Sequence, residues 1–278
     1  MKTKFITFGN HHKWRDYVGA GERLTNQAKA CGHFDSTRLY TDLDLKKKKT
    51  FWNRHGEWFE KTKGFGYWAW KPYFILNELN NLVDGDVLMY ADGGCEIGRS
   101  WVDRTDRVGK SHSRGKSDCD LFPEYFKSVQ DEIIITTLAG TSELPYNKMD
   151  TIQKIGVDLH GDDIYEGQRR QYQATTCMFK VCGLAREFVK HWLDLCLADD
   201  YHYVDDSPSV LPNDSSFKQH RHDQSIYSLL LKKYRIGNEK NQRGNKDWPT
   251  VNTSMTDCIY INKARSRETK LPKCLRLI

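Results

Sequence analysis

Short apolar stretches alternate along the chain with longer stretches in which apolar residues recur every three or four positions. The short stretches predict strands at residues 4–8, 38–40, 86–91, 133–137, 174–181 and 258–262. The longer pattern predicts helices at residues 20–31, 72–83 and 184–197, and a further helix that begins at Asp223. This alternation indicates an α/β fold in which helices flank a mostly parallel central sheet.

The strand at residues 86–91 (DVLMYA) is strongly apolar, which is typical of a strand buried on both faces of a sheet. It ends at Asp92-Gly93-Gly94, and sheets of this class bind ligands beyond the carboxyl ends of their strands. A carboxylate there suits a divalent cation that bridges two phosphates, and the two glycines let the backbone approach a ligand closely. A turn-forming role for Asp92 is the simpler alternative.

An aromatic and cationic segment, GFGYWAWKPY at residues 64–73, leads into the predicted helix, whose first turn suits Pro72. Lys71 lies in the same turn, where the helix dipole is slightly unfavourable for a cation. It is therefore either a surface lysine or a cation placed near the phosphates of a ligand. Tyr67, Trp68 and Trp70 either belong to the core or pack against a base or a sugar ring.

Two polar segments, residues 98–120 and 199–220, contain many turn-forming residues, and long loops in compact domains are often lids or substrate loops. Four consecutive lysines at residues 46–49 predict a solvated loop or helix face.

Five segments resemble, in the same order, the nucleotide-sugar glycosyltransferases of the GT-A fold. They most resemble the small enzymes of large algal viruses of the chlorovirus type and the related bacterial capsule-polysaccharide transferases. Together the segments span about residues 1–236, and they are FITFGN at 5–10, RLTNQA at 23–28, GFGYWAWKPY at 64–73, DGDVLMYADGGCEI at 84–97 and RHDQSIYSLL at 221–230.

The resemblance implies a GT-A-like (Rossmann-like) α/β fold with a mixed, mostly parallel central sheet flanked by helices. It also implies that the donor substrate is a UDP-sugar. Thr7, Phe8 and Gly9, at the end of the first predicted strand, would border the uracil and the ribose. Lys71 would approach the donor phosphates, where a cation stabilises the charge that develops on the departing UDP.

The resemblance also implies a bound Mn²⁺ or Mg²⁺. Asp92 would be the first acid of a DxD-like motif that holds the cation against the diphosphate, and the motif departs from a strict DxD because residue 94 is glycine. Glu96, His220 and His222 are candidates for a further ligand, and His222 is our prediction. A lone histidine is more often structural or solvated.

Asp223 and Gln224 open the last predicted helix, where Asp223 also suits the role of N-cap. The resemblance implies that Asp223 and Gln224 are catalytic, with Asp223 as the general base of an inverting, metal-dependent transfer to a glycan hydroxyl. A retaining transferase, in which both side chains face the donor sugar, is the alternative. The expected acceptor is a surface glycan, such as one on a viral capsid glycoprotein.

The chain of 278 residues is 38% hydrophobic, which is enough for a sizeable core and argues against wholesale disorder. Residues 240–278 contain nine Lys or Arg residues and three Asp or Glu residues, an excess that equals the net charge of +6. We therefore expect a glycosyltransferase domain at residues 1–239 and a basic extension at residues 240–278. A single-strand nucleic-acid binder is the alternative from another class, but its aromatic and basic residues would not lie in separate clusters. We expect no nucleic-acid partner.

The sequence contains no run of about 18 apolar residues, and the apolar stretch at its beginning is too short for a signal peptide. We expect no membrane span and a cytoplasmic location, in the host if the chain is viral. The eight cysteines form no CxxC pair and lack zinc-site spacing, which predicts reduced thiols.

Overall fold

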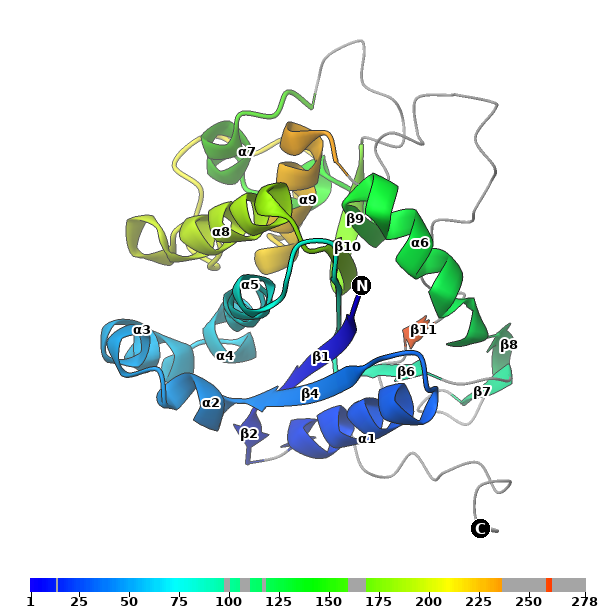
Figure 1. Cartoon of the computed structure of the whole chain (residues 1–278). Coiled ribbons are helices and arrows are strands. Elements are labelled where there is room, and N and C mark those ends of the chain that lie inside the picture. Colours follow the sequence, from blue (N-terminus) through cyan, green and yellow to red (C-terminus); the bar gives the residue numbers. More distant parts are fainter. Residues whose placement is uncertain are drawn as a thin grey trace, which may run out of the picture.

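The computed structural model describes residues 1–13, 15–97, 101–105, 111–116, 119–159, 169–236 and 259–261. A five-stranded sheet with the strand order β4-β1-β5-β10-β9 runs through the middle of the molecule (Figure 1). In chain order its strands are β1 (Thr3–Gly9), β4 (Ser36–Thr41), β5 (Val87–Ala91), β9 (Ile134–Ser142) and β10 (Arg170–Lys180).

The sheet is mixed, and four of its five strands point the same way. β1 pairs in parallel with β4 on one side and with β5 on the other. β10 pairs antiparallel with both β5 and β9, so it alone is reversed. The prediction of a mixed, mostly parallel central sheet is thus confirmed.

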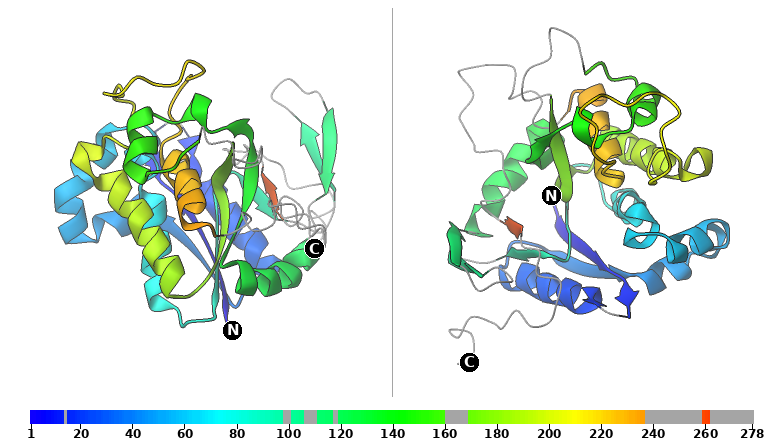
Figure 2. Two further views of the ribbon diagram at one scale, coloured as in Figure 1. Left: turned by 90° about the horizontal axis from the view of Figure 1, so that it is seen from above. Right: turned by 180° about the vertical axis from the view of Figure 1, so that it is seen from behind.

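Helices cover both faces of this sheet (Figures 1 and 2). One face carries α1 (Tyr17–Ala30) and α6 (Phe122–Glu132). The other face carries α5 (Trp70–Asn81), α8 (Gly183–Leu197) and α9 (Asp223–Tyr234). The remaining helices are α2 (Asp42–Lys46), α3 (Lys49–Lys61), α4 (Gly64–Tyr67) and α7 (Met149–Ile155), with single 3-10 turns at Cys119–Leu121, Leu144–Tyr146 and Asp199–Tyr201.

Strand alternation divides the core into two clusters. Along β5, Val87 and Met89 pack toward α1 and α6, whereas Leu88 and Tyr90 pack toward α5, α8 and α9. Every residue of β5 is buried, as its apolar sequence predicts. This strand therefore holds the following residue, Asp92, at a rigid position.

Several elements differ from the prediction. α3 and α6 lie where no helix is predicted, although apolar residues such as Phe122, Phe126 and Val129 face one side of α6. α1 begins three residues early because the carboxylate of Asp16 caps it, accepting a hydrogen bond of 2.8 Å from the amide of Gly19. The segment 98–120 contains two paired strands, β7 (Trp101–Thr105) and β8 (Ser111–Lys116).

The loop at residues 199–220 is packed against the domain by two charged residues of the α7 region. Lys148, whose side chain is buried, donates to Asp205 Oδ1 at 3.1 Å and to the carbonyl of His202. Asp150 accepts hydrogen bonds from the amides of Val210 and Leu211. The loop is therefore fixed to the domain by partly buried polar contacts, while several of its residues, such as Val210, stay exposed.

Two further short strand pairs complete the description. β2 (His11–His12) pairs with β3 (Arg15–Asp16), and β6 (Cys95–Ile97) pairs antiparallel with β11 (Ile259–Ile261). β11 confirms the last predicted strand. Its pairing with β6 joins this part of the chain to the domain directly after the Asp92 loop. The rest of the basic extension lies outside the described residues, so the proposed division at residue 239 stays a prediction.

Within the described ranges, every helix is too short or too polar to cross a bilayer. The six cysteines in these ranges are free thiols, as predicted, and five of them are buried.

Candidate active site

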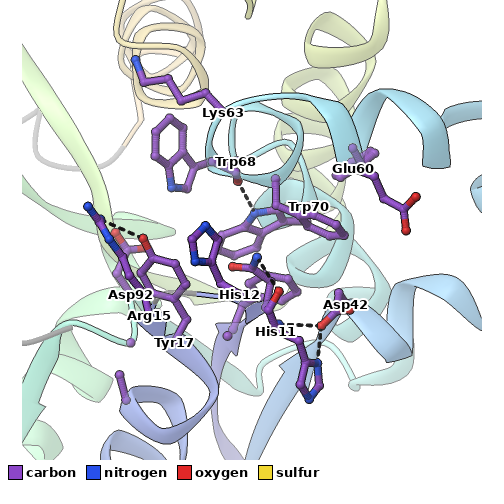
Figure 3. A pocket seen from close by; sticks show the side chains of 18 of the residues that line it. His11, His12, Arg15, Tyr17, Asp42, Glu60, Lys63, Trp68, Trp70 and Asp92 are labelled. Atoms are coloured by element: carbon purple, nitrogen blue, oxygen red, sulfur yellow. Dashed lines mark hydrogen bonds and ion pairs between the residues drawn. The ribbon is translucent and has the colours of Figure 1, made fainter. Parts of the chain in front are cut away.

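A pocket with a volume of about 680 Å³ opens where β1 and β5 end (Figure 3). Because β1 and β5 are neighbouring parallel strands, their carboxyl ends meet at the same edge of the sheet. Five of the predicted donor-site and metal-site residues line this pocket, namely Phe8, Gly9, Asp92, Gly93 and Gly94. Thr7 does not line it, since Thr7 is buried within β1.

Asp92 is held at the pocket by its backbone and by one of its two carboxylate oxygens. Its amide donates to the carbonyl of Thr175 on β10 at 2.8 Å. Its Oδ1 accepts a hydrogen bond from the Tyr90 hydroxyl and lies 3.3 Å from Nζ of Lys71. The side chain is 35% exposed, and within the described part of the chain no side chain pairs with Oδ2. One carboxylate oxygen is therefore available to a ligand.

Lys71 lies in the first turn of α5, as predicted, but it is not a surface lysine. It is 3% exposed, it does not line the pocket, and its Nζ lies 2.9 Å from Oδ2 of Asp223. Burial alone would lower the pKa of Lys71, but the carboxylates of Asp223 and Asp92 raise it above its ordinary value. Lys71 is thus a buried cation that links two carboxylates, only one of which reaches the pocket.

Asp223 is the first residue of α9, and the N-cap position belongs to His222 instead. The prediction of an Asp223 cap is therefore wrong, because the chain enters the helix one residue earlier. Burial raises the pKa of Asp223 to about 6, against the opposing charge of Lys71 and with a further increase from Asp92. Asp223 is almost fully buried and does not line the pocket. Gln224 points its amide at Gln171 Oε1, at 3.0 Å.

The two candidate histidines are engaged by other groups. His220 accepts from the amide of Lys148 through Nδ1. In His222, Nδ1 lies 2.8 Å from the carbonyl of Val204, and Nε2 lies 3.2 Å from Nζ of Lys63. Burial lowers the pKa of His222, so the ring is neutral at pH 7. In the ranges that the structure describes, no three His, Cys, Asp or Glu side chains cluster in a way that could hold a metal ion. A metal-ligand role for His222 stays a prediction, one that these contacts do not favour.

The pocket lining contains more basic residues than the sequence analysis predicted. Its cations come from the β2–β3 segment, which contributes Lys13 and Arg15, and from Lys46 and Lys63. Arg15 donates to the hydroxyl of Tyr17 at 3.0 Å (Figure 3). The signal that was overlooked is the run HHKWR at residues 11–15, which follows the first strand directly. A basic segment after a strand in a parallel arrangement suits an anionic ligand.

The aromatic residues of the segment 64–73 divide between core and pocket. Trp70 is buried and stacks on Phe8 with a centroid distance of 3.8 Å, so both rings form the pocket floor. Trp68 lines the pocket, and both Trp68 and Tyr67 pack against the ring of His222. Phe65, Tyr67 and Trp68 all have φ between 45° and 65°, a left-handed backbone that is costly for non-glycine residues. Strain of this kind concentrates at functional sites.

The loop after Asp92 is fastened from α1. Arg23 donates through Nη2 to the carbonyls of Gly93 and Cys95, at 2.9 and 3.0 Å. A Cβ atom on Gly93 would lie 3.4 Å from the carbonyl oxygen of Phe8 and 3.4 Å from the amide of Gly21. These are ordinary van der Waals distances, so packing against α1 does not by itself require a glycine at position 93.

No protein-family model matches the chain, and no curated protein sequence matches it. Among solved structures, the chain is similar to the galactosyltransferase LgtC in complex with donor and acceptor sugar analogues. The identity is 12%, the similarity covers 82% of this chain and 70% of that chain, and the TM-score is 0.39. It is also similar to mouse xyloside xylosyltransferase 1 in its apo form, with 10% identity, 84% and 83% coverage and a TM-score of 0.40. Both similarities are too distant to assign a function, so the chemistry of the site rests on its own residues.

Proposed function

We propose that this chain is a glycosyltransferase that moves a sugar from a UDP-sugar to a hydroxyl of a glycan with the help of a divalent cation. The observation that carries the proposal is the pocket at the ends of β1 and β5, which combines the half-exposed carboxylate of Asp92 with several cations. A pyrophosphate requires positive charge, and the carboxyl edge of parallel strands is where such ligands bind.

The cations of the β2–β3 segment, Lys13 and Arg15, are the groups in the lining that suit the donor diphosphate. Arginine in particular binds phosphate oxygens with two parallel hydrogen bonds. Phe8 and Gly9, on the first strand, form the part of the wall assigned to uracil and ribose. Each of these assignments is a proposal about this chain's residues.

The donor set of the pocket fits Mn²⁺ or Mg²⁺. Such cations are commonly held by one or two carboxylates, with phosphate and water oxygens as the other ligands. Asp92 would be the carboxylate ligand, because it directly follows β5 at the carboxyl edge of the sheet. The two other acids of the lining, Asp42 and Glu60, belong to α2 and α3 and lie 3.7 and 2.9 Å from Nζ of Lys46. When bound, the cation would neutralise charge on the departing diphosphate.

Inversion with Asp223 as the general base is part of the proposal, and Gln224 would lie beside it. A pKa of about 6 suits a base at neutral pH, since the group is ionised and still accepts a proton readily. The buried ammonium group of Lys71 contacts both this carboxylate and Asp92, so one cation lies between the proposed base and the donor site. A retaining transfer, in which these groups face the donor sugar, stays the alternative. The expected acceptor is a surface or capsid glycan.

Incubation of the protein with a panel of UDP-sugars, beginning with UDP-xylose and UDP-glucose, tests the proposal. The assay measures UDP release and glycosylated product with Mn²⁺ and with EDTA. Metal-dependent UDP release from at least one donor, lost in Asp92→Asn, supports a transferase. Absence of UDP binding and release under all conditions would contradict it, and tight binding of single-stranded nucleic acid would then favour the alternative class.

A further inference from the structure

Asp92 can offer a metal ion a single oxygen. Its Oδ1 already accepts a hydrogen bond from the Tyr90 hydroxyl and lies 3.3 Å from Nζ of Lys71. Its Oδ2 has no protein partner among the described residues. A carboxylate fixed in this way cannot turn to chelate a cation with both oxygens. The protein part of a cation site at this position is therefore one oxygen.

The net negative charge around that oxygen is also small, because nearby cations offset it. The carboxylates of Asp92 and Asp223 carry two negative charges, and Lys71 between them cancels one. Further cations, Lys13 and Arg15, line the same pocket and offset part of the remaining charge. Affinity for a hard divalent cation rises with the number of charged oxygen ligands. The protein alone thus lacks the charge and the ligand number that such a cation needs, and a diphosphate would supply both.

Building on the proposed function, we propose that Lys71 and Tyr90 are positioning residues that keep Asp92 from binding a divalent cation on its own. The chain would then take up Mn²⁺ only together with a nucleoside diphosphate, as a ternary complex. This role for Lys71 acts through Asp92, in contrast to the direct contact with the donor phosphates that the sequence analysis expected. It explains why a lysine of the active-site region is buried behind the carboxylate.

The test measures binding, not turnover. Free Mn²⁺ gives a six-line electron paramagnetic resonance signal that disappears on binding, so titrations with protein alone, UDP alone and both together separate the complexes. We expect UDP to raise the Mn²⁺ affinity of the protein at least about tenfold, and calorimetry to show that Mn²⁺ raises the UDP affinity by the same factor. Mn²⁺ binding of equal strength with and without UDP would overturn the inference.

A variant provides a result that a purely structural role would not produce. Lys71→Met removes the cation that neutralises Asp92, so Mn²⁺ binding without UDP should become stronger, by about fivefold or more. Lys190→Met is the matched control, because Lys190 forms an exposed pair with Asp194 at 2.5 Å on α8. A folded Lys71→Met protein with unchanged Mn²⁺ affinity would overturn the role of Lys71.

Tyr90→Phe keeps the inference testable if Lys71→Met does not fold. This change removes one hydrogen bond to Oδ1 and leaves every charge in place, so UDP-independent Mn²⁺ binding should again increase. No increase in a folded Tyr90→Phe protein would count against the inference. Failure of the wild type to bind UDP, with Mn²⁺ or without it, would instead contradict the proposed function.

Discussion

Nζ of Lys71 lies 2.9 Å from Oδ2 of Asp223, and this ion pair joins the first turn of α5 to the first turn of α9. Both side chains are buried, so each charge depends on the other for its stabilisation. A buried ion pair is a weak source of net stability, but removal of one partner leaves an uncompensated charge in the interior. The first prediction follows from this asymmetry.

Lys71→Met should lower the free energy of unfolding by about 3 to 5 kcal/mol at pH 8, because Asp223 then lacks the opposing charge that lowers its pKa and stabilises its ionised form. The loss should be smaller at pH 5, because Asp223 can then take up a proton. Chemical denaturation at both pH values measures the difference, with the exposed Lys190→Met as the control. An equal loss at the two pH values would mean that Asp223 is not the group left unpaired.

Gly9 allows β1 to end against the start of α1. A Cβ atom at this position would lie 2.3 Å from the carbonyl oxygen of Tyr17, a contact that the backbone of α1 would have to relieve. Gly9→Ala should therefore cost about 2 kcal/mol of stability and weaken UDP binding. Gly140→Ala in β9 is the matched control, since nothing lies within 4 Å of its added Cβ. Equal melting temperatures for the two variants would contradict this packing argument.

Local pattern and chain order predict the strands and the place of the site well. The apolar run of β5 and the acid that follows it identify the edge where Asp92 meets the end of β1. Because β1 and β5 run in parallel, their ends meet at one edge of the sheet, and this places Phe8 and Asp92 in one pocket. These features depend on short segments whose character is visible in the sequence.

Features that depend on partners distant in the sequence could not be predicted in the same way. Lys71 has the position of a surface residue in a first turn, and only Asp223, far along the chain, explains its burial. Helix α3 begins at Lys49, the last of four consecutive lysines, and the charge of that run hid the amphipathic pattern of the residues after it. The link from Arg23 to the Gly93 carbonyl is likewise a tertiary contact with no local signal.

Asp92→Asn should reduce the affinity for UDP in Mn²⁺ at least about tenfold, because an amide oxygen is a much weaker ligand than a carboxylate for a hard cation. The side chain is partly exposed, so the melting temperature should change little. Calorimetry with Mn²⁺ and with EDTA gives both affinities. If the variant and the wild type bind UDP equally in Mn²⁺, Asp92 is not the metal ligand.

The strand pairing of β11 with β6 separates two truncations. Deletion of residues 264–278 leaves β11 in place, so hydrolysis of the UDP-sugar should continue at nearly the full rate. Deletion of residues 237–278 removes the partner of β6, the strand that begins three residues after Asp92. Loss of that pairing should loosen the loop and weaken UDP binding several-fold. Equal UDP affinity in the two truncated proteins would show that β11 does not support the site.

Asp223→Asn tests the base assignment, and the magnitudes of its two effects can be told apart. The amide cannot accept the acceptor proton, so transfer should fall by at least about a hundredfold while UDP affinity stays near normal. In the wild type, transfer should decline below pH 6 as Asp223 becomes protonated, and the variant should lack this decline.

The stability contributed by Asp223 should change with pH in the opposite direction to the transfer rate. The folded-state pKa lies above the value of about 3.9 expected in the unfolded chain, so folding takes up a proton between these values. The free energy of unfolding of the wild type should therefore rise relative to that of the variant as the pH falls from 7 to 5. Taking the difference cancels buried histidines such as His220, whose lowered pKa acts the other way in both proteins. A variant that transfers sugar at more than a tenth of the wild-type rate would assign the base to another group.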